Sequence, residues 1–291
     1  MPFRRRRRKE KEMQAAVYNP TLRWRALSLM MSSVGRLSKG IDLGYRYGFD
    51  SGEMLDYVYE NRARGRLGIG VLLDRLYLNS VGWRGIRSRK RVLKRVLGHE
   101  ISRVRERVMG PARVLDVASG PGRYLLELCE DMRERGQDPG ARVQIVCRDM
   151  DEAGLEQGRR RAAELGLTNV RYEPGDATSA HSLNGVLPRP DLVVVSGLYE
   201  LFTDAATIRR SMEAIHGILP PGGTLVFTTQ VSHPQLELIA NVLVNREGRP
   251  WVMGCRTVEE AESLARDAGF KVVSTEVEPV GLFAVTVCRR V

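Results

Sequence analysis

The stretch Val114-Leu-Asp-Val-Ala-Ser-Gly-Pro-Gly122 decides the fold. Its first four residues predict a buried β-strand with an acidic residue near its end, and the glycines after it predict a tight turn before a helix over 123–135. At such a turn, unpaired backbone N–H groups and the positive end of the helix meet at one point. A ligand site is therefore expected around Asp116, Ala118, Gly120 and Gly122.

From residue 112 onward, short β-rich runs alternate with helical stretches. Five strands are predicted at 113–117, 143–148, 170–173, 192–196 and 224–229, and further helices are predicted at 152–165 and 207–218. This alternation is typical of an open parallel sheet with helices on both faces. Two last runs, 271–278 and 282–287, flank Pro279-Val-Gly281 and predict an antiparallel hairpin. Before them, Thr257-Val-Glu-Glu260 predicts a capping box at a helix start.

The preceding residues, 13–110, predict helices and no period-two strand. Apolar residues recur at three- and four-residue steps over 22–34 and over 84–109, and another helix is expected at 53–61. The Gly- and Tyr-rich piece 40–52 predicts a loop. The expected division is a basic disordered tail (1–12), an N-terminal helical cap or lid (13–110) and an α/β domain (111–291).

Charge is distributed unevenly. The formal net charge is +11, of which residues 1–12 carry +5 and residues 84–107 carry +8, so the remainder is about −2. A basic tail of this kind is expected to stay solvated or to contact anionic membranes. The four cysteines lie far apart without metal-ligand spacing, so neither a disulfide framework nor a metal site is expected. With no signal peptide and no apolar run that spans a bilayer, a cytoplasmic or membrane-peripheral protein is expected.

Acidic residues follow the second and third predicted strands. Asp149 comes directly after the second strand, where a carboxylate can accept both hydroxyls of a ribose, whereas Asp151 is placed to cap the next helix. Asp176 follows the third strand and can accept a proton from an adenine amino group. After the fourth strand, the backbone carbonyls of Ser196-Gly-Leu198 can receive an ammonium group.

This combination resembles the class I S-adenosylmethionine-dependent methyltransferases. The resemblance implies a Rossmann-like, seven-stranded sheet, S-adenosyl-L-methionine as the cofactor and S-adenosyl-L-homocysteine as its product. In that class a glycine usually stands where this chain has Ala118, and the methyl group of an alanine is tolerable there if its φ stays negative. A dinucleotide fingerprint would need glycine in place of Leu125. The residues expected to bind the cofactor are Asp116, Ala118, Gly120, Gly122, Asp149, Met150, Asp176, Ala177, Ser196 and Tyr47.

Short blocks resemble one bacterial family of class I methyltransferases, some members of which are fused to an α/β-hydrolase. These blocks, spread over 40–291, are Phe49–Gly52 with Leu55–Asn61, Gly82–Arg87, Ser196–Phe202, and His233–Ala240 with Trp251–Met253. The chain departs from that family at Ser232, where an aromatic residue is usual, so the pocket for the acceptor is expected to differ. No G-x-S-x-G nucleophile elbow occurs here, so no hydrolase is expected in this sequence. The fusion hints at acyl or lipid metabolism.

Three residues are candidates for catalysis. His233 is either the general base of an O-methylation or a cap of the turn before Pro234. Glu200 either orients the acceptor, deprotonates it or assists a C-methylation, or else pairs with an arginine. Tyr199, like Tyr45 and Tyr47, suits a pocket wall or a hydrogen bond to the cofactor carboxylate. No metal is required for this transfer.

The acceptor is expected to be a small or lipid-like molecule. An RNA methyltransferase is the enzymatic alternative, because the basic stretch 84–107 could grip phosphates. However, Ser196-Gly-Leu-Tyr199 lacks the Asn/Asp-Pro-Pro-aromatic block of base N-methyltransferases, and no cysteine is placed as a cytosine C5 nucleophile. A non-catalytic cofactor-binding partner or regulatory protein is the remaining alternative, encouraged only by Ala118.

Overall fold

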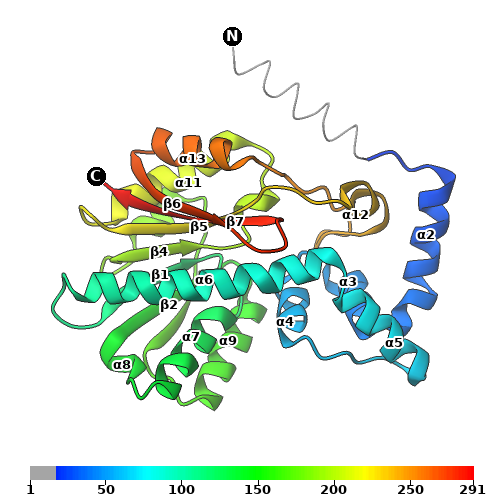
Figure 1. Ribbon diagram of the computed structural model, residues 1–291, viewed down its shortest axis with the longest axis horizontal. Helices are drawn as coiled ribbons and strands as arrows, with labels where there is room; N and C mark the ends of the chain where they lie inside the picture. Colours follow the sequence, from blue (N-terminus) through cyan, green and yellow to red (C-terminus); the bar gives the residue numbers. More distant parts are fainter. Residues whose placement is uncertain (1–17) are drawn as a thin grey trace, which may run out of the picture. The chain divides into compact units, whose positions relative to one another are not determined.

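The computed structural model describes residues 18–291, so the predicted tail 1–12 lies outside the described residues. The chain divides into two compact units (Figure 1). We call 88–231 with 255–291 the sheet unit, and 232–254 with the residues up to Arg87, described from 18, the helical unit. This division differs from the predicted boundary at 110. The second half of helix α6 (Val81–Arg105) buries Leu93, Leu97 and Ile101 in the core of the sheet unit, so it belongs there.

The sheet unit is built on one seven-stranded sheet. Its strands are β1 (Ala112–Val117), β2 (Val143–Asp149), β3 (Val170–Pro174), β4 (Leu192–Val195), β5 (Thr224–Gln230), β6 (Phe270–Val277) and β7 (Phe283–Arg290), in the order β3-β2-β1-β4-β5-β7-β6. The first five are parallel, and β7 is antiparallel to both neighbours. This is the class I methyltransferase fold, and it confirms the predicted Rossmann-like sheet with its terminal hairpin.

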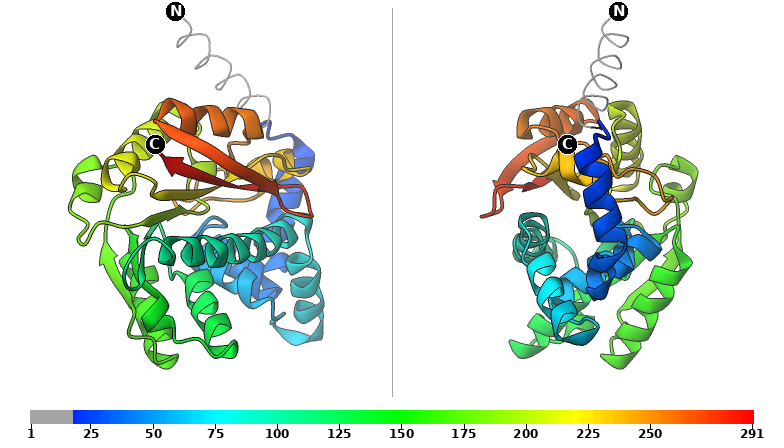
Figure 2. Two further views of the ribbon diagram at one scale, coloured as in Figure 1. Left: turned by 60° about the vertical axis from the view of Figure 1, so that its left-hand side comes forward. Right: turned by 90° about the vertical axis from the view of Figure 1, so that its right-hand side faces the viewer.

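Helices cover both faces of this sheet (Figure 2). They are α7 (Arg123–Glu134), α8 (Pro139–Arg142), α9 (Glu152–Glu164), α10 (Ala180–Asn184), α11 (Ala205–Ile218) and α13 (Val258–Asp267), with a 3₁₀ turn, η2 (Tyr199–Leu201). Successive residues of a strand point to opposite faces. Val114 accordingly belongs to the core under α6, α7 and α9, while Leu115 belongs to the core under α11 and α13. The predicted capping box is confirmed at Thr257 and Glu260.

The helical unit contains short helices joined by tight connections. They are α2 (Leu22–Ser32), η1 (Val34–Leu37), α3 (Lys39–Tyr47), α4 (Gly52–Glu60), α5 (Leu67–Leu78), α12 (Leu236–Val242) and the first turns of α6. Distant segments meet here, because the Phe49 N–H donates to the Val244 carbonyl at 2.9 Å and Trp83 stacks on Trp251 with ring centroids 6.4 Å apart. Residues 232–254 therefore fold with the N-terminal helices.

The loop predicted at 40–52 is wrong over most of its length, because α3 occupies it. Ser38 caps this helix by accepting the Ile41 N–H at 3.1 Å. A Cβ on Gly40 would lie 2.7 Å from the Tyr77 ring, and one on Gly44 would lie 2.3 Å from the Phe49 ring. These glycines allow close packing of aromatic rings against a helix, and only residues 48–51 remain as the connection to α4.

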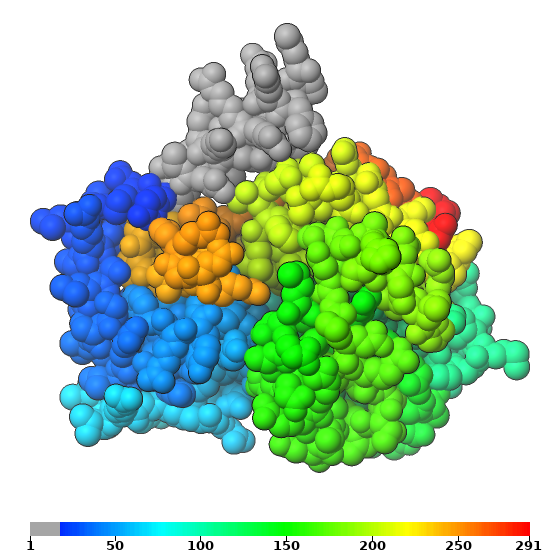
Figure 3. Space-filling view, turned by 180° about the vertical axis from the view of Figure 1, so that it is seen from behind, coloured from blue at the N-terminus to red at the C-terminus, as the bar shows by residue number. Residues whose placement is uncertain are grey.

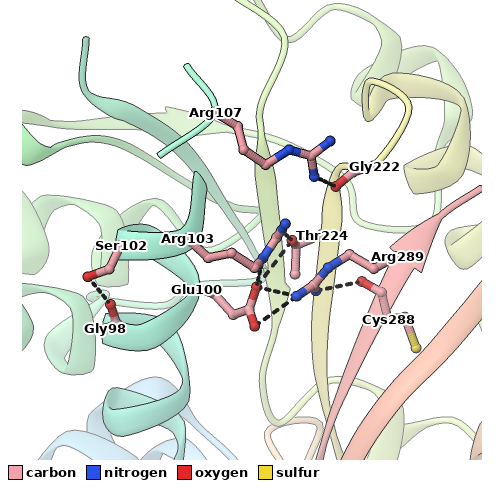
Figure 4. Close-up of polar contacts among 9 residues, drawn as sticks. All are labelled: Gly98, Glu100, Ser102, Arg103, Arg107, Gly222, Thr224, Cys288 and Arg289. Atoms are coloured by element: carbon pink, nitrogen blue, oxygen red, sulfur yellow. Dashed lines mark hydrogen bonds and ion pairs between the residues drawn. The ribbon is translucent and has the colours of Figure 1, made fainter. Parts of the chain in front are cut away.

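Glu100 holds α6 to the sheet (Figure 4). Its carboxylate is 4% exposed and pairs with Arg289 of β7 at 2.7 Å and with Arg103 at 2.9 Å. Arg103 in turn donates to the Thr224 hydroxyl at 2.6 Å. Burial acts to raise the pKa of Glu100, but the hydrogen bonds from the two arginines outweigh it and lower this pKa. One carboxylate thereby joins the helix to two strands.

Candidate functional site

The turn after β1 has an alternating left-handed backbone. Positive φ occurs at Ala118 (57°), Gly120 (52°) and Gly122 (66°). The negative φ that was the condition for tolerating an alanine at position 118 is therefore not met. Ala118 thus adopts a left-handed conformation that favours glycine, at the cost of crowding between its Cβ and the backbone.

Replacing Ala118 with glycine should stabilise the protein. A non-glycine residue in the left-handed region costs about 1 kcal/mol, although glycine returns part of this gain through the entropy of the unfolded chain. We expect Ala118→Gly to raise the free energy of unfolding by roughly 0.5 kcal/mol, measured by urea denaturation. A lower free energy of unfolding would show that the methyl group contributes more through packing than it costs in strain.

Asp149 organises the turn from the neighbouring strand. Its Oδ2 accepts the Gly120 N–H at 2.8 Å, and its Oδ1 accepts the Asp151 N–H at 2.9 Å. A carboxylate has about four acceptor positions, so each oxygen keeps one more for a ligand hydroxyl. Asp151 accepts the Ala153 N–H at 3.1 Å, which confirms its predicted role as the cap of α9. A Cβ on Gly120 would meet no atom within 4 Å, so this side of the turn is open.

Residues that the sequence analysis did not single out pack against the turn after β1. A Cβ on Gly122 would lie 2.8 Å from the Cys147 sulfur, and one on Gly158 of α9 would lie 2.3 Å from the Tyr172 ring. The Tyr172 hydroxyl donates to the Pro121 carbonyl at 3.0 Å. The signal was the pair Gly154 and Gly158 on one face of α9, which lets this helix approach the turn closely.

Asp116 lies behind the turn, with none of its surface exposed. Burial raises the pKa of Asp116 to about 8, the hydrogen bond from Tyr124 lowers it, and the charge of Asp149 raises it further. The carboxyl group is therefore mostly protonated at neutral pH. Its side chain has no exposed surface for a ligand.

The other residues predicted at the nucleotide end are placed differently from one another. Met150 is 76% exposed directly after Asp149. The Oδ1 of Asp176 accepts both the N–H and the hydroxyl of Thr178, at 2.8 and 2.7 Å, so Oδ2 keeps its acceptor positions. Ala177 is buried, and its carbonyl accepts the Ser211 hydroxyl. Asp149, Met150 and Asp176 thus have groups available to a ligand. Ala177, in contrast, packs in the interior.

A buried polar relay follows β4. The Thr228 hydroxyl accepts the Gly197 N–H at 3.0 Å and donates to Glu200 Oε1 at 2.8 Å. Arg89 of α6 pairs with the same oxygen at 3.3 Å, and both charged side chains are at most 6% exposed. The alternative prediction for Glu200, a partner for an arginine, describes this geometry. The relay fixes the backbone after Ser196, which is half-buried.

Tyr199 belongs to the core beneath this segment. It is 3% exposed, its hydroxyl lies 3.2 Å from the Ser211 hydroxyl, and its ring meets Phe227 edge-on. Burial raises the pKa of Tyr199 well above its usual range. Its side chain packs inside the sheet unit and has almost no surface for a substrate.

His233 and Tyr47 belong to the helical unit, whereas the other predicted site residues belong to the sheet unit. His233 Nδ1 accepts the Gln235 N–H at 3.1 Å, so the proton of the neutral ring is on Nε2. A Cβ on Gly82 would lie 2.7 Å from Nε2, so α6 packs against this nitrogen. The role of His233 as a turn cap matches these contacts. Tyr47 is 48% exposed at the end of α3.

Acid should destabilise the protein through His233. Burial lowers the pKa of His233 from 6.5 to about 4. Between these pH values the unfolded chain binds a proton that the folded chain does not, so stability falls as pH decreases from 6.5 to 4, by up to about 3 kcal/mol. We expect His233→Gln to remove this part of the pH dependence. Urea denaturation of both proteins at pH 7.5 and pH 4.5 measures it, and equal losses in both would contradict the assignment.

Comparisons with known proteins identify a family for this sequence. The sequence family described as "Putative methyltransferase" matches residues 2–290. A relative from Escherichia coli (strain K12), "Uncharacterized protein YnbC", is 40% identical over 271 residues, which are 92% of this chain and 45% of the relative. This chain therefore spans about half the length of that relative.

Solved structures share the fold. A "possible exported protein" from Bordetella parapertussis superposes with a TM-score of 0.67 at 20% identity, covering 97% of this chain and 93% of that one. Magnesium protoporphyrin IX methyltransferase from Synechocystis PCC 6803, solved with bound S-adenosylhomocysteine, has a TM-score of 0.56 at 12% identity, covering 89% of this chain and 99% of that one. At these identities the likeness concerns the fold.

Proposed function

This chain belongs to that methyltransferase family, and from this premise we propose that it transfers a methyl group from S-adenosylmethionine to a small or lipid-like acceptor. The observation that carries the proposal is the contact of Asp149 with the Gly120 N–H, beside the open face of the turn. A strand-end carboxylate tied to a left-handed glycine turn is suited to hold a nucleoside.

The residues present fit this cofactor. Asp149 keeps acceptor positions for two ribose hydroxyls, Met150 offers an exposed apolar surface for the adenine ring, and Asp176 Oδ2 can accept an amino proton. The turn at Gly120 leaves space for the amino-acid end. The segment after Ser196, which the Thr228 relay fixes, offers backbone carbonyls to an ammonium group.

The cofactor supplies a methyl group on positively charged sulfur, which leaves as a neutral thioether. The chain orients this donor through Asp149 and through the turn, and holds the backbone after β4 through the relay of Glu200, Thr228 and Arg89. Such positioning lowers the barrier of an in-line displacement without a metal. Glu200 acts here as a positioning residue, since its charge is already paired.

A base role for His233 stays a prediction, and two observations oppose it. The Nδ1 lone pair is taken by the Gln235 N–H, and burial lowers the pKa of His233 to about 4. A general base works best with a pKa near the working pH. We therefore propose that positioning, rather than proton removal by His233, accounts for most of the rate.

The basic stretch 84–107 gives little support to an RNA acceptor. Lys90 pairs with Glu127 at 2.7 Å, and Lys94 pairs with Asp131 at 2.9 Å. Glu100 pairs with Arg103 at 2.9 Å within the same helix. These pairs take up part of the positive charge of the stretch and leave less of it for phosphates, which favours the small or lipid-like acceptor.

Calorimetry and labelled turnover test the proposal. We expect the full chain to bind S-adenosylmethionine and S-adenosylhomocysteine, and to transfer tritiated methyl to a component of a bacterial lipid or small-molecule extract but not to total RNA. Absence of binding by the intact chain contradicts the cofactor assignment. Binding with labelled RNA favours the RNA methyltransferase, and binding without transfer to either pool favours a non-catalytic cofactor-binding protein.

A further inference from the structure

Helix α5 has a face that is buried in the helical unit and an apolar face that is exposed. Gly70, Asp74 and Leu78 are buried, whereas Ile69, Leu72 and Leu76 are 66%, 57% and 63% exposed. The exposed residues recur at steps of three and four, so they form one stripe, which we call the outer face of α5. The segment that contains α5 lies on the surface of the unit (Figure 3, cyan).

The buried face fixes the orientation of this helix. Asp74, with none of its surface exposed, accepts the Ser38 hydroxyl at 2.6 Å and the backbone N–H groups of Gly40 and Arg64 at 2.7 Å each. The Tyr57 hydroxyl donates to it as well. With this anchor satisfied, the helix cannot rotate to bury its outer face inside the unit without losing these bonds.

Positive charge borders the outer face. Residues 61–84 hold five arginines and one acidic residue, the buried Asp74. Arg66 at the N-cap of α5 and Arg75 in its last turn are exposed, and so is Arg62 in the segment before the helix, while Arg64 pairs with Glu60 at 2.7 Å. This stretch has exposed leucine, isoleucine and arginine side chains and no exposed carboxylate. Such a combination complements a surface that has anionic groups above an apolar interior.

We propose that the outer face of α5 docks in the plane of an anionic lipid bilayer. Ile69, Leu72 and Leu76 enter the acyl boundary, and the guanidinium groups of Arg62, Arg66 and Arg75 meet lipid phosphates. With 12 residues, the helix is about 18 Å long and lies along the surface. Among the described residues, no helix has the length and apolarity to cross a bilayer.

Vesicle binding by the full chain tests this docking without cofactor, so its result is independent of methyl transfer. We expect sedimentation with vesicles of phosphatidylglycerol and phosphatidylcholine, and weak sedimentation with phosphatidylcholine alone. The double variant Leu72→Asp, Leu76→Asp should bind the anionic vesicles at least about tenfold more weakly. Leu187→Asp is the matched control, since Leu187 is 71% exposed on the sheet unit, and it should bind like the unchanged protein.

A site-specific probe separates this face from the basic N-terminal residues, which can also attract anionic lipid. A solvent-sensitive fluorophore attached at Leu72→Cys should shift to the blue with anionic vesicles, and one at Leu187→Cys should not. Unchanged emission at position 72, or equal binding by the double aspartate variant, overturns the proposal. The proposal is also overturned if light scattering shows that the unchanged protein is a dimer and the double aspartate variant a monomer, since the outer face would then bind a second copy.

Discussion

Asp149→Ala should reduce the affinity for S-adenosylmethionine by about a hundredfold, which corresponds to roughly 3 kcal/mol. The substitution removes the carboxylate proposed to accept the ribose hydroxyls, and it also releases the N–H groups of Gly120 and Asp151. The turn then loses its tie to β2, so both the contact and the pre-formed geometry are lost. Calorimetry with the cofactor and with S-adenosylhomocysteine measures the change.

Asp138→Ala is the matched control for this prediction. Asp138 also accepts a backbone N–H, that of Gly140 at 2.9 Å, but it does so at the connection before β2, at the opposite end of that strand from Asp149. We expect its cofactor affinity to remain within about twofold of the unchanged protein. Equal losses in the two variants would indicate general destabilisation, and urea denaturation of both proteins checks this directly.

Glu100→Ala should lower the free energy of unfolding by about 3 kcal/mol or more. The truncation leaves the half-buried guanidinium groups of Arg289 and Arg103 facing each other without their shared carboxylate. Removing one member of a buried ion pair costs more than the pair contributes, because an uncompensated charge stays in the interior. Glu106→Ala, at an exposed position just beyond the same helix, should change stability by less than about 0.5 kcal/mol.

The same carboxylate gives a pH dependence with a defined sign. Because the pKa of Glu100 is lowered in the folded protein, its contribution is fully present above the pKa of the unfolded chain and is lost as pH falls through the lower, folded value. Glu100→Ala should therefore lose less stability on acidification than the unchanged protein. Parallel acid titrations followed by circular dichroism show whether the two curves converge.

Local interactions were predictable from the sequence. The central strands β4 and β5 follow from short apolar runs, because burial on both faces of a parallel sheet favours continuous apolar residues, and the pair β6 and β7 follows from two β-rich runs around a short turn. The capping box at Thr257 and the cap at Asp151 involve groups at most three residues apart, so residue type and spacing were enough. The confirmed fold therefore rests mainly on patterns within one element.

Contacts between distant residues could not be predicted in the same way. The glycines of α3 suggested a loop, because their aromatic neighbours, such as Tyr77, are remote in sequence from Gly40. Glu200 meets Arg89, 111 residues away, and no spacing rule links the two. The φ angle of Ala118 depends on how the turn returns to the helix, which residue type alone does not specify. The burial of a side chain and its ion pairs, which a sequence motif does not specify, distinguish a positioning residue such as Glu200 from a residue exposed to a ligand.

The helical unit is assembled from two pieces of chain, and this has a consequence for how the protein can be altered. The chain leaves the sheet after Val231 and returns at Cys255, and the excursion between them folds with residues 18–87. Its Arg246 N–H donates to Asp50 at 2.7 Å, and Val242 accepts the Tyr45 hydroxyl at 3.1 Å. Deleting one contiguous segment of the chain therefore cannot remove the helical unit as a whole. Chimaeras that exchange both segments between relatives should fold, whereas an exchange of either one alone separates residues that hydrogen-bond to each other.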